Sequence, residues 1–344
     1  MENSRRAIRV VVVIPAYRVE DSIRRVLLEI PSWVNHIIVV DDASPDSTED
    51  AVRAVGDPRI ILLRRDHNGG VGKATLSGFK KAVELEADVV IKMDGDGQMD
   101  PSYLGQLIEP LITGEADYVK GNRFRDKRVL SEMPKTRLFG NSCLAFLTKA
   151  ASGYWDIFDP TNGFIAIRGE VLRRLNLDKL HPRYFFEISM LLALSRIRAT
   201  VVDVPIPARY GDEKSSLSPT TCLLAFPFYL AKGLISRIFW QYFLVDFNAG
   251  TLFLTSGMPL LLWGIGFGVH AWVKSFQTGK VTSTGTVMLS VLPLLMGFHL
   301  LVQALVIDVW MTPRRALCPP LTRPNGSRVR RNLKVQSTAK ASSR

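Results

Sequence analysis

Cysteine is scarce in this 344-residue chain, and its positions exclude two kinds of covalent or metal-based stabilisation. The three cysteines, Cys143, Cys222 and Cys318, lie far apart in the sequence. This spacing fits neither a disulfide framework nor a zinc site built from thiolates. We therefore expect the folded part of the protein to lie in the cytosol, where disulfides are rare.

Charged residues are missing from two long stretches near the carboxyl end. None occurs between Asp246 and Lys274, and none occurs between Lys280 and Asp308. Each gap is longer than the roughly 20 residues that a helix needs to cross a bilayer. We predict two transmembrane helices, at about residues 250–273 and 284–308, in preference to a pair of buried core helices.

Acidic residues are absent after Trp310, whereas lysine and arginine are frequent there and supply much of the net charge of +12. The tail is low in aromatic residues, so it lacks the interleaved basic and aromatic side chains of a nucleic-acid surface, and no nucleic-acid partner is expected. Positive charge beside a membrane span favours the cytoplasmic side. The sequence thus predicts a multi-pass integral protein of the plasma membrane, with its folded domain and both termini cytoplasmic.

The first hundred residues alternate between β-branched and helical patterns. Strands are predicted over residues 8–14, 36–40, 59–63 and 89–93, and helices over residues 21–29, 47–55 and 71–85. This alternation is typical of an α/β fold with a mainly parallel sheet that helices cover on both faces. Later elements are predicted as helices over 101–112, 136–150 and 185–194, and as a strand over 200–204. Ligands bind such sheets beyond the carboxyl ends of the strands.

An apolar, aromatic-rich segment joins the α/β part to the first predicted span. Residues 221–247 are interrupted by Pro227, Lys232, Gly233 and Arg237, which makes them poorly suited to a clean span. We predict interfacial amphipathic helices there, while the last core helices of the preceding domain are the alternative. The predicted regions are a catalytic domain, interfacial helices, two transmembrane helices and a basic disordered tail, at residues 1–220, 221–247, 248–311 and 312–344.

Two carboxylates one residue apart follow the fourth predicted strand, in Asp94-Gly95-Asp96-Gly97-Gln98. Mg²⁺ and Mn²⁺ prefer oxygen ligands and can complete their shell with substrate phosphates, while glycine lets a diphosphate approach the backbone. The same residues also form ordinary turns that cap a helix, so the motif by itself leaves both interpretations open. An EF-hand loop is excluded because its twelfth position is Gly105.

Three further motifs follow predicted strands at the same edge of the sheet. Asp41-Asp42 could accept hydrogen bonds from a base or ribose, and Tyr17 in Ile14-Pro15-Ala16-Tyr17 could lie against a ring. Strand-end aspartates also commonly cap the next helix. Asn68-Gly69-Gly70-Val71-Gly72-Lys73 opens a helix and could offer backbone amides to an anion. It is not a Walker A loop, because the first glycine would fall at His67 and Ala74 follows the lysine.

Together these motifs, in their order and spacing, resemble those of the inverting family 2 glycosyltransferases with the GT-A fold. The similarity is closer to polyprenyl-phosphate glycosyltransferases of the dolichol-phosphate mannose synthase and bacterial undecaprenyl-phosphate glucosyltransferase type. Four more segments resemble that group: Gly121-Asn122-Arg123-Phe124, Asp159-Pro160-Thr161-Asn162-Gly163-Phe164, Phe185-Phe186-Glu187 and Arg209-Tyr210-Gly211-Asp212-Glu213-Lys214-Ser215-Ser216. The resemblance covers roughly residues 8–310 and implies a Rossmann-like GT-A domain followed by interfacial helices and two transmembrane helices.

The resemblance implies a role for each motif. The metal, Mg²⁺ or Mn²⁺, would be held by Asp94, Asp96 and Gln98. The nucleotide-sugar would contact the metal ligands, Gly95, and the strand-end and basic residues Pro15, Tyr17, Asp41, Asp42, Arg209 and Lys214. Arg123 and Arg137 would bind the lipid phosphate, because arginine presents a planar fork to phosphate oxygens. Each of these cations could instead be a solvated surface charge. Asn141 replaces a small hydroxyl residue that relatives often carry one turn after Arg137, which leaves that acceptor contact open.

The implied reaction transfers a sugar, with inversion, from a nucleotide-sugar to undecaprenyl phosphate or dolichyl phosphate. A phosphate monoester has a second pKa of about 6 and is largely ionised at neutral pH, so the acceptor needs positioning more than deprotonation. The catalytic candidates are Asp96, Arg123 and Asp159, the last as a base, as an orienting carboxylate or as a simple Asp-Pro turn residue. A UDP-hexose is the favoured donor and GDP-mannose the alternative. Whether the protein forms a homo-oligomer is open.

Three other functions compete with this one. A processive polysaccharide synthase would share the GT-A core but should carry a Gln-x-x-Arg-Trp segment and more spans, which the sequence lacks. A transferase for a protein or soluble sugar acceptor would not need apolar helices followed by two spans. A catalytically silent membrane scaffold would retain the nucleotide-binding fold alone, and the presence of Asp94, Asp96 and Arg209 argues against it.

Overall fold

The computed structural model describes residues 7–125, 135–207 and 219–321. Contacts divide the chain into two compact units, of which the first comprises the chain up to Ala231 together with the segment from Pro313 onward. The second unit comprises Lys232–Thr312. The first unit therefore extends past the domain boundary predicted after residue 220, and it includes a segment that follows the apolar helices.

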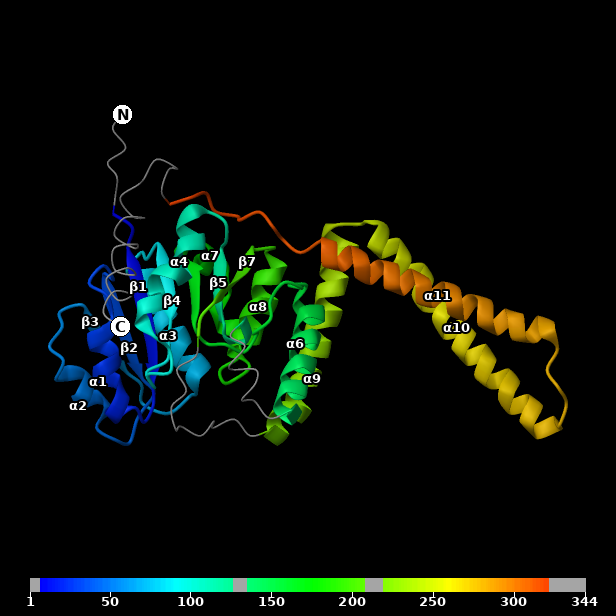
Figure 1. The fold of residues 1–344 in the computed structure, drawn as a ribbon, viewed down its shortest axis with the longest axis horizontal. Helices are drawn as coiled ribbons and strands as arrows, with labels where there is room; N and C mark the ends of the chain where they lie inside the picture. Colours follow the sequence, from blue (N-terminus) through cyan, green and yellow to red (C-terminus); the bar gives the residue numbers. More distant parts are fainter. Residues whose placement is uncertain (1–6, 126–134, 208–218, 322–344) are drawn as a thin grey trace, which may run out of the picture. The chain divides into compact units, whose positions relative to one another are not determined.

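A seven-stranded sheet forms the centre of the first unit in the described part of the chain, with the order β3-β2-β1-β4-β6-β5-β7 (Figure 1). The four predicted strands are confirmed to within two residues and pair in parallel; they are β1 (Val10–Ala16), β2 (His36–Asp41), β3 (Ile60–Arg64) and β4 (Val89–Lys92). The predicted strand near residue 200 is β7 (Val201–Pro205). Its neighbour β5 (Tyr118–Asn122) runs parallel to it and was not predicted.

One strand runs against the others. β6 (Ile165–Arg168), also not predicted, lies antiparallel between β4 and β5. The carboxyl ends of β4 and β5 therefore meet the amino end of β6 at one edge of the sheet. This is the edge at which the predicted motifs follow β1, β2 and β4.

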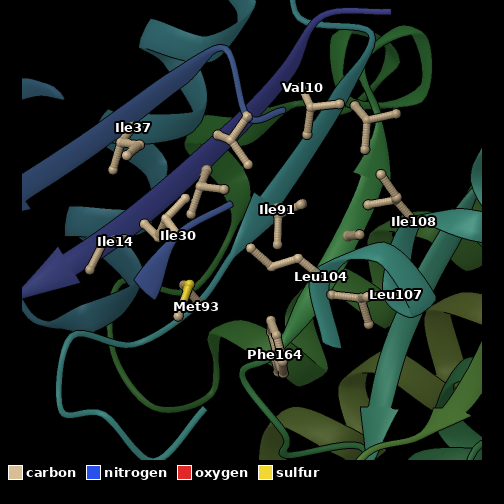
Figure 2. Close-up of a cluster of buried hydrophobic side chains, with 14 of the residues drawn as sticks. Val10, Ile14, Ile30, Ile37, Ile91, Met93, Leu104, Leu107, Ile108 and Phe164 are labelled. Atoms are coloured by element: carbon tan, nitrogen blue, oxygen red, sulfur yellow. The ribbon is translucent and has the colours of Figure 1, made fainter. Parts of the chain in front are cut away.

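Helices cover both faces of the sheet, as predicted for its apolar strands. One face packs against α1 (Glu20–Glu29), α2 (Thr48–Arg53) and α4 (Leu104–Thr113). Figure 2 shows this cluster, which includes Val10 and Ile14 of β1 and in which Ile91 of β4 lies beside Leu104 of α4. The other face packs against α3 (Val71–Glu84), α7 (Gly169–Arg174) and α8 (Phe186–Arg196). Neighbouring residues of β1 alternate between the two clusters, which is the period of two that a strand requires.

Helix α9 (Pro219–Ile238) occupies most of the segment 221–247, which was predicted to form interfacial amphipathic helices. It is continuous through Pro227 and Gly233, and a π-helical turn, η4 (Phe239–Val245), follows it. A proline inside a helix removes one backbone hydrogen bond, but tertiary packing supports this segment. The rings of Phe226 and Tyr229 pack edge-on and tilted against that of Phe185, with centroids 5.1 and 5.2 Å away, and Leu230 is buried.

Two long helices, α10 (Ala249–Thr278) and α11 (Thr284–Trp310), make up most of the second unit. Each is long and apolar enough to cross a membrane, and only 11% of its most apolar window is buried. A core helix of a soluble protein would be mostly buried. Glycines bring the two helices together: a Cβ at Gly264 would lie 2.6 Å from the backbone nitrogen of Leu294, and one at Gly297 would lie 2.4 Å from that of Leu261. Small residues at helix contacts are typical of membrane bundles.

The C-terminal strap, residues 313–321, corrects the prediction of disorder from residue 312 onward. The backbone N–H groups of Leu317 and Cys318 donate to the buried carboxylate of Asp117, at 2.8 to 3.2 Å. The N–H of Leu321 donates to the carbonyl oxygen of Ile112 at 3.0 Å. Apolar residues within this part of the basic tail supply the packing, and Cys318 is buried in the core. The remaining tail residues, 322–344, lie outside the described part.

Replacing Asp117 with alanine should destabilise the first unit. The carboxylate accepts from the buried N–H groups of Thr200 and Cys318 and from the partly buried N–H of Leu317, and an unsatisfied buried donor costs about 1–3 kcal/mol. We expect the free energy of unfolding to fall by roughly 3 kcal/mol and Tm by about 10 °C. Thermal unfolding of the purified protein in detergent measures the change. The control is Asp178→Ala, whose side chain is 80% exposed. An equal Tm for both variants would contradict the role given to Asp117.

Candidate active site

The sheet register brings three sequence motifs to the same edge. Ala16 is the strand partner of Asp41, and the N–H of Asp42 donates to the carbonyl oxygen of Ala16 at 2.9 Å. The N–H of Met93 donates to the carbonyl oxygen of Val13 at 3.1 Å, so the Asp94 turn follows directly beside β1. This edge is where an open α/β sheet binds its ligands.

Pro15 and Tyr17 occupy the end of β1. Pro15 is buried within the strand, whereas the Tyr17 ring is 42% exposed beyond it. The guanidinium of Arg18 lies 5.4 Å from the ring centroid. An aromatic ring that is exposed at this edge can stack on a planar ligand such as a base.

Asp42 is buried and is the centre of a hydrogen-bonded loop. It accepts from Arg65 at 2.6 Å and from the N–H groups of Gly69 and Gly70, the latter at 2.7 Å. The amides of Gly69 and Gly70 are therefore occupied within the protein, because the anion that they bind is Asp42. Gly72 is explained by packing as well, since a Cβ there would lie 2.5 Å from the carbonyl oxygen of His181.

Asp41 is also buried and points into the same loop region. Its Oδ1 accepts from the N–H of Ser44 at 2.9 Å, and its Oδ2 lies 3.5 Å from the guanidinium of Arg64. Together Asp41 and Asp42 fix the loops that follow β2 and β3. The loop after β2 lies beside the end of β1, since the N–H of Arg18 donates to Ser44 Oγ at 3.2 Å.

The Asp94–Gln98 turn follows β4 with both carboxylates partly exposed. Asp94 Oδ1 lies 2.8 Å from the ammonium of Lys92, and Asp96 Oδ1 accepts from the N–H of Gln98 at 2.9 Å. Ser22 donates to the carbonyl oxygen of Gly95 at 2.8 Å. Gly97 has a φ of +80°, in the left-handed region that favours glycine. The motif is thus a hydrogen-bonded turn that carries two carboxylates, so the two interpretations of the sequence do not exclude each other.

The residues of this turn fit a divalent cation that a substrate helps to bind. Within the described residues, no group of three or more His, Cys, Asp or Glu side chains could hold a metal by itself. Mg²⁺ and Mn²⁺ commonly take one or two protein carboxylates and complete their shell with phosphate oxygens and water. Asp94, Asp96 and Gln98 offer oxygen ligands of this kind at the ligand-binding edge.

Arg123 and Asp159 form a two-pronged ion pair where β5 ends. The Nε and Nη2 of Arg123 donate to Oδ2 and Oδ1 of Asp159 at 2.8 and 3.1 Å. Asp159 is fully buried, while 36% of the Arg123 side chain is exposed. Because both carboxylate oxygens accept from the guanidinium, this geometry favours an orienting role for Asp159 over that of a base.

A buried polar network beneath this pair was missed by the sequence analysis. Lys120 donates to the carbonyl oxygen of Asn162 at 2.8 Å, and burial lowers the pKa of Lys120 to about 8 although nearby carboxylates oppose the shift. Asp203 accepts from Asn122 and from the N–H of Phe158. Burial raises the pKa of Asp203 to about 6. The sequence signal that could have indicated this network is Lys120, which directly follows the apolar residues Tyr118 and Val119.

The raised pKa of Asp203 gives a testable dependence of stability on pH. The folded protein takes up this proton at about pH 6, and the unfolded chain does so near 3.8. The contribution of Asp203 to the free energy of unfolding is therefore lost as pH rises from about 4 to 6, and it amounts to roughly 3 kcal/mol for a two-unit shift. We expect Asp203→Asn to gain about that much stability relative to the parent across this window, as measured by thermal unfolding in detergent. A constant difference between the two proteins from pH 4 to 7 would contradict the assignment.

Three predicted phosphate-binding residues cannot be placed by side chain. Arg209 and Lys214 lie outside the described residues, and Arg137 belongs to α6 (Lys135–Ser152) with its side chain likewise outside them. α6 itself carries exposed Phe139 and Phe146, with Phe139 73% exposed. These apolar side chains on a surface helix were not predicted.

Comparisons with known proteins agree with this geometry. Residues 11–176 match the model of Glycosyl transferase family 2, and this range includes the Asp94 turn and the Arg123–Asp159 pair. Undecaprenyl-phosphate mannosyltransferase of Micrococcus luteus is 32% identical over 216 residues, which are 60% of this chain and 88% of that protein. UDP-N-acetylglucosamine–dolichyl-phosphate N-acetylglucosaminyltransferase of Methanococcus voltae is 29% identical over 232 residues, 63% of this chain and 92% of that protein.

A solved structure is similar over the same part of the fold. Glucosyl-3-phosphoglycerate synthase from Mycobacterium tuberculosis, in complex with Mn²⁺, UDP-glucose and phosphoglyceric acid, gives a TM-score of 0.50 at 25% identity. The match covers 67% of this chain and 80% of that one. A chain of similar fold thus binds a divalent cation together with a nucleotide-sugar.

Proposed function

Because the chain belongs to glycosyl transferase family 2 and is a glycosyltransferase, we propose that it transfers a hexose from a nucleotide-sugar to the phosphate of a polyprenyl phosphate. The observation that carries the proposal is the presence, in one chain, of the Asp94–Gln98 turn at the ligand edge and of two largely exposed helices long enough to cross a bilayer. A lipid acceptor explains why a nucleotide-sugar enzyme would carry such helices. Relatives whose names include undecaprenyl-phosphate and dolichyl-phosphate acceptors support the same acceptor class.

The donor end of the site is assigned to the residues that follow β1, β2 and β4. Asp94, Asp96 and Gln98 would hold Mg²⁺ or Mn²⁺, which when bound supplies positive charge for the departing nucleoside diphosphate. Gly95 is buried, and a Cβ there would lie 3.1 Å from Ile23 Cδ1, so its part would be to let the turn pack against α1. The exposed Tyr17 ring, with Pro15 behind it, would lie against the base, and Asp41 and Asp42 hold the surrounding loops in place. Arg209 and Lys214 are proposed to bind the donor phosphates.

The acceptor end is assigned to Arg123, whose guanidinium is held by Asp159. Its side chain is 36% exposed at this edge of the sheet, and a guanidinium fixed in advance loses less conformational freedom when it binds a phosphate. Arg137 of α6 would provide a second cation for the same phosphate. The lipid phosphate is already ionised at neutral pH, so these residues need only orient it for attack. Asp159 then acts by orientation.

The covalent step is a single displacement at the sugar C1. One oxygen of the lipid phosphate forms a bond to C1 as the bond from C1 to the diphosphate oxygen breaks. The electron pair leaves with the nucleoside diphosphate, and the configuration at C1 inverts. Catalysis is then mainly a matter of positioning and of electrostatic stabilisation.

Helices α10 and α11 are proposed to span the plasma membrane, with residues 1–220, the basic tail and both termini on the cytoplasmic side. Positive charge in the tail favours this orientation. Exposed aromatic side chains of α6 and α9, among them Phe139, Phe146 and Phe228, would lie at the membrane surface.

A UDP-hexose is proposed as donor, supported by the UDP-sugar named in the Methanococcus relative. GDP-mannose is the alternative, since the relatives from Micrococcus luteus and Mycolicibacterium smegmatis are named for mannose transfer. The test incubates detergent-purified protein with polyprenyl phosphate, Mg²⁺ or Mn²⁺, and a panel of UDP- and GDP-sugars. Mass spectrometry should show one glycolipid, formed from a UDP-hexose and abolished by EDTA. If no donor yields glycolipid, the proposed function is wrong and the silent scaffold is favoured.

A further inference from the structure

Two buried lysines lie on one face of the sheet, on the two strands that flank β6. In the strand register Lys92 of β4 and Lys120 of β5 are both opposite Ile165 of β6. Partners in register project to the same face, which here is the face that α8 covers. Glu187 lies in the first turn of α8 and is buried as well. A strand that is buried on both faces gives a lysine no access to water, so each ammonium needs a partner within the protein.

Lys92 has its partners on two sides. Its side chain is 1% exposed, and its ammonium lies 2.8 Å from Asp94 Oδ1 and 3.2 Å from Glu187 Oε1. Burial by itself would lower the pKa of Lys92, but the two carboxylates outweigh it and hold that pKa above its ordinary value. Lys92 is therefore a cation that joins the turn after β4 to helix α8.

Gly163 lies against the Lys92 ammonium on a third side and so completes the enclosure of this group. A Cβ at this position would lie 2.3 Å from the Lys92 ammonium and 3.1 Å from Asp94 Oδ2. The position therefore has no room for a side chain while the ammonium remains where it is. Gly163 belongs to the segment between Asp159 and β6, so the enclosure also links the two ends of the site.

The arrangement distinguishes the two oxygens of Asp94. Oδ1 is buried against Lys92, although the side chain as a whole is 30% exposed. The open side of the carboxylate is therefore that of Oδ2. An aspartate held through one oxygen cannot rotate freely, and its second oxygen keeps one direction.

We infer that Lys92 and Glu187 are positioning residues that fix the Asp94 carboxylate so that Oδ2 meets the cation bound with the nucleoside diphosphate. Glu187 holds Lys92, Lys92 holds Oδ1, and Gly163 leaves the space that both contacts need. This inference rests on the proposed function, because it takes Asp94 as a ligand of that cation. Removing a group that orients a metal ligand typically lowers the metal affinity by about 10- to 100-fold.

The test measures the affinity of the full-length protein in detergent for Mn²⁺, once in the presence of UDP and once in the presence of GDP. The concentration of unbound Mn²⁺ is monitored by its electron paramagnetic resonance signal. Lys92→Met should weaken Mn²⁺ binding by about tenfold or more. A lysine that acted only through its charge would repel the cation, and its removal would strengthen binding. Unchanged or tighter binding in Lys92→Met therefore overturns the inference.

Further variants separate positioning from a general effect on the fold. Glu187→Gln should weaken binding in the same direction, and the double variant Lys92→Met/Glu187→Gln should lose less than the product of the two single losses, because both act through one contact. In turnover, the KM for Mn²⁺ should rise while kcat at saturating Mn²⁺ changes less. If the loss of Mn²⁺ affinity in the double variant equals the product of the two single losses, the two residues do not act through one contact.

Gly163→Ala keeps every charge and displaces the ammonium, so it tests the geometry even if Lys92→Met fails to fold. It should also weaken Mn²⁺ binding, and normal affinity in this variant would overturn the inference. Lys80→Met, which removes an exposed lysine on α3, is the matched control and should bind Mn²⁺ as the parent does. Absence of Mn²⁺ binding by the parent with either nucleotide would instead contradict the proposed function.

Discussion

Replacing Asp96 with asparagine is expected to lower kcat for glycolipid formation by about 10³-fold. Asp96 belongs to the turn proposed to hold the cation and the donor diphosphate, and its loss removes negative charge from the ligand set. The amide oxygen of asparagine can still accept the N–H of Gln98, which closes the turn at 2.9 Å in the parent. The loss should therefore come from cation binding and leave the turn intact. Product formation at saturating donor and acceptor, with Mn²⁺ varied, measures it.

The control for this variant is Asp178→Asn, which makes the same chemical change at an exposed position outside the site. It should keep the activity of the parent, and both variants should keep the parent Tm. Transfer that survives in Asp96→Asn, with a cation still required, would show that the cation assignment is wrong.

Arg123→Lys is expected to lower kcat/KM for the polyprenyl phosphate by about 10²-fold, which is the typical effect of a small misplacement of a reacting group. Lysine keeps the charge, but it cannot reproduce the two parallel hydrogen bonds that Arg123 makes to Asp159. The cation would no longer be held in one direction. The KM for the nucleotide-sugar should change little, because Arg123 is assigned to the acceptor. Initial rates with each substrate varied in turn separate the two effects.

A matched control exists on the protein surface. Arg53 donates through Nε and Nη2 to Glu49 at 3.1 and 2.8 Å, in an exposed pair on α2. Arg53→Lys breaks a surface pair in which both donors meet one oxygen of Glu49, at a residue assigned to neither substrate, and should leave the kinetics unchanged. If Arg123→Lys behaves like this control, Arg123 is a surface charge without a role in acceptor binding.

The elements that could be predicted from the sequence are those in which neighbouring residues alone indicate burial. β1 to β4 are short runs of β-branched residues between helical patterns, and such runs are recognisable because a sheet covered on both faces requires apolar side chains on both. β5 was missed for the converse reason. Tyr118–Asn122 contains lysine, glycine and asparagine, and only the pairing with β6 and β7 makes it a strand.

Contacts between distant residues account for the parts of the structure that the sequence did not indicate. The glycines after Asn68 have the composition of an anion-binding loop, and they do bind an anion, but that anion is Asp42, which lies 27 residues before Gly69. The partner of Asp117 in the strap lies 200 residues further along the chain. Local patterns carry no information on such pairs. The position of Lys92 between Asp94 and Glu187 is of the same kind, because it depends on where α8 packs.

The central claim is that a membrane lipid phosphate is the acceptor, and a comparison of acceptors tests it most directly. Detergent-purified protein, Mn²⁺ and the active nucleotide-sugar are incubated with a polyprenyl phosphate, with the polyprenol of equal length, or with phosphoglyceric acid, the ligand named in the similar solved structure. Mass spectrometry should show a sugar joined through a phosphodiester to the polyprenyl phosphate alone. Equal or greater product from the polyprenol or from phosphoglyceric acid would contradict the account.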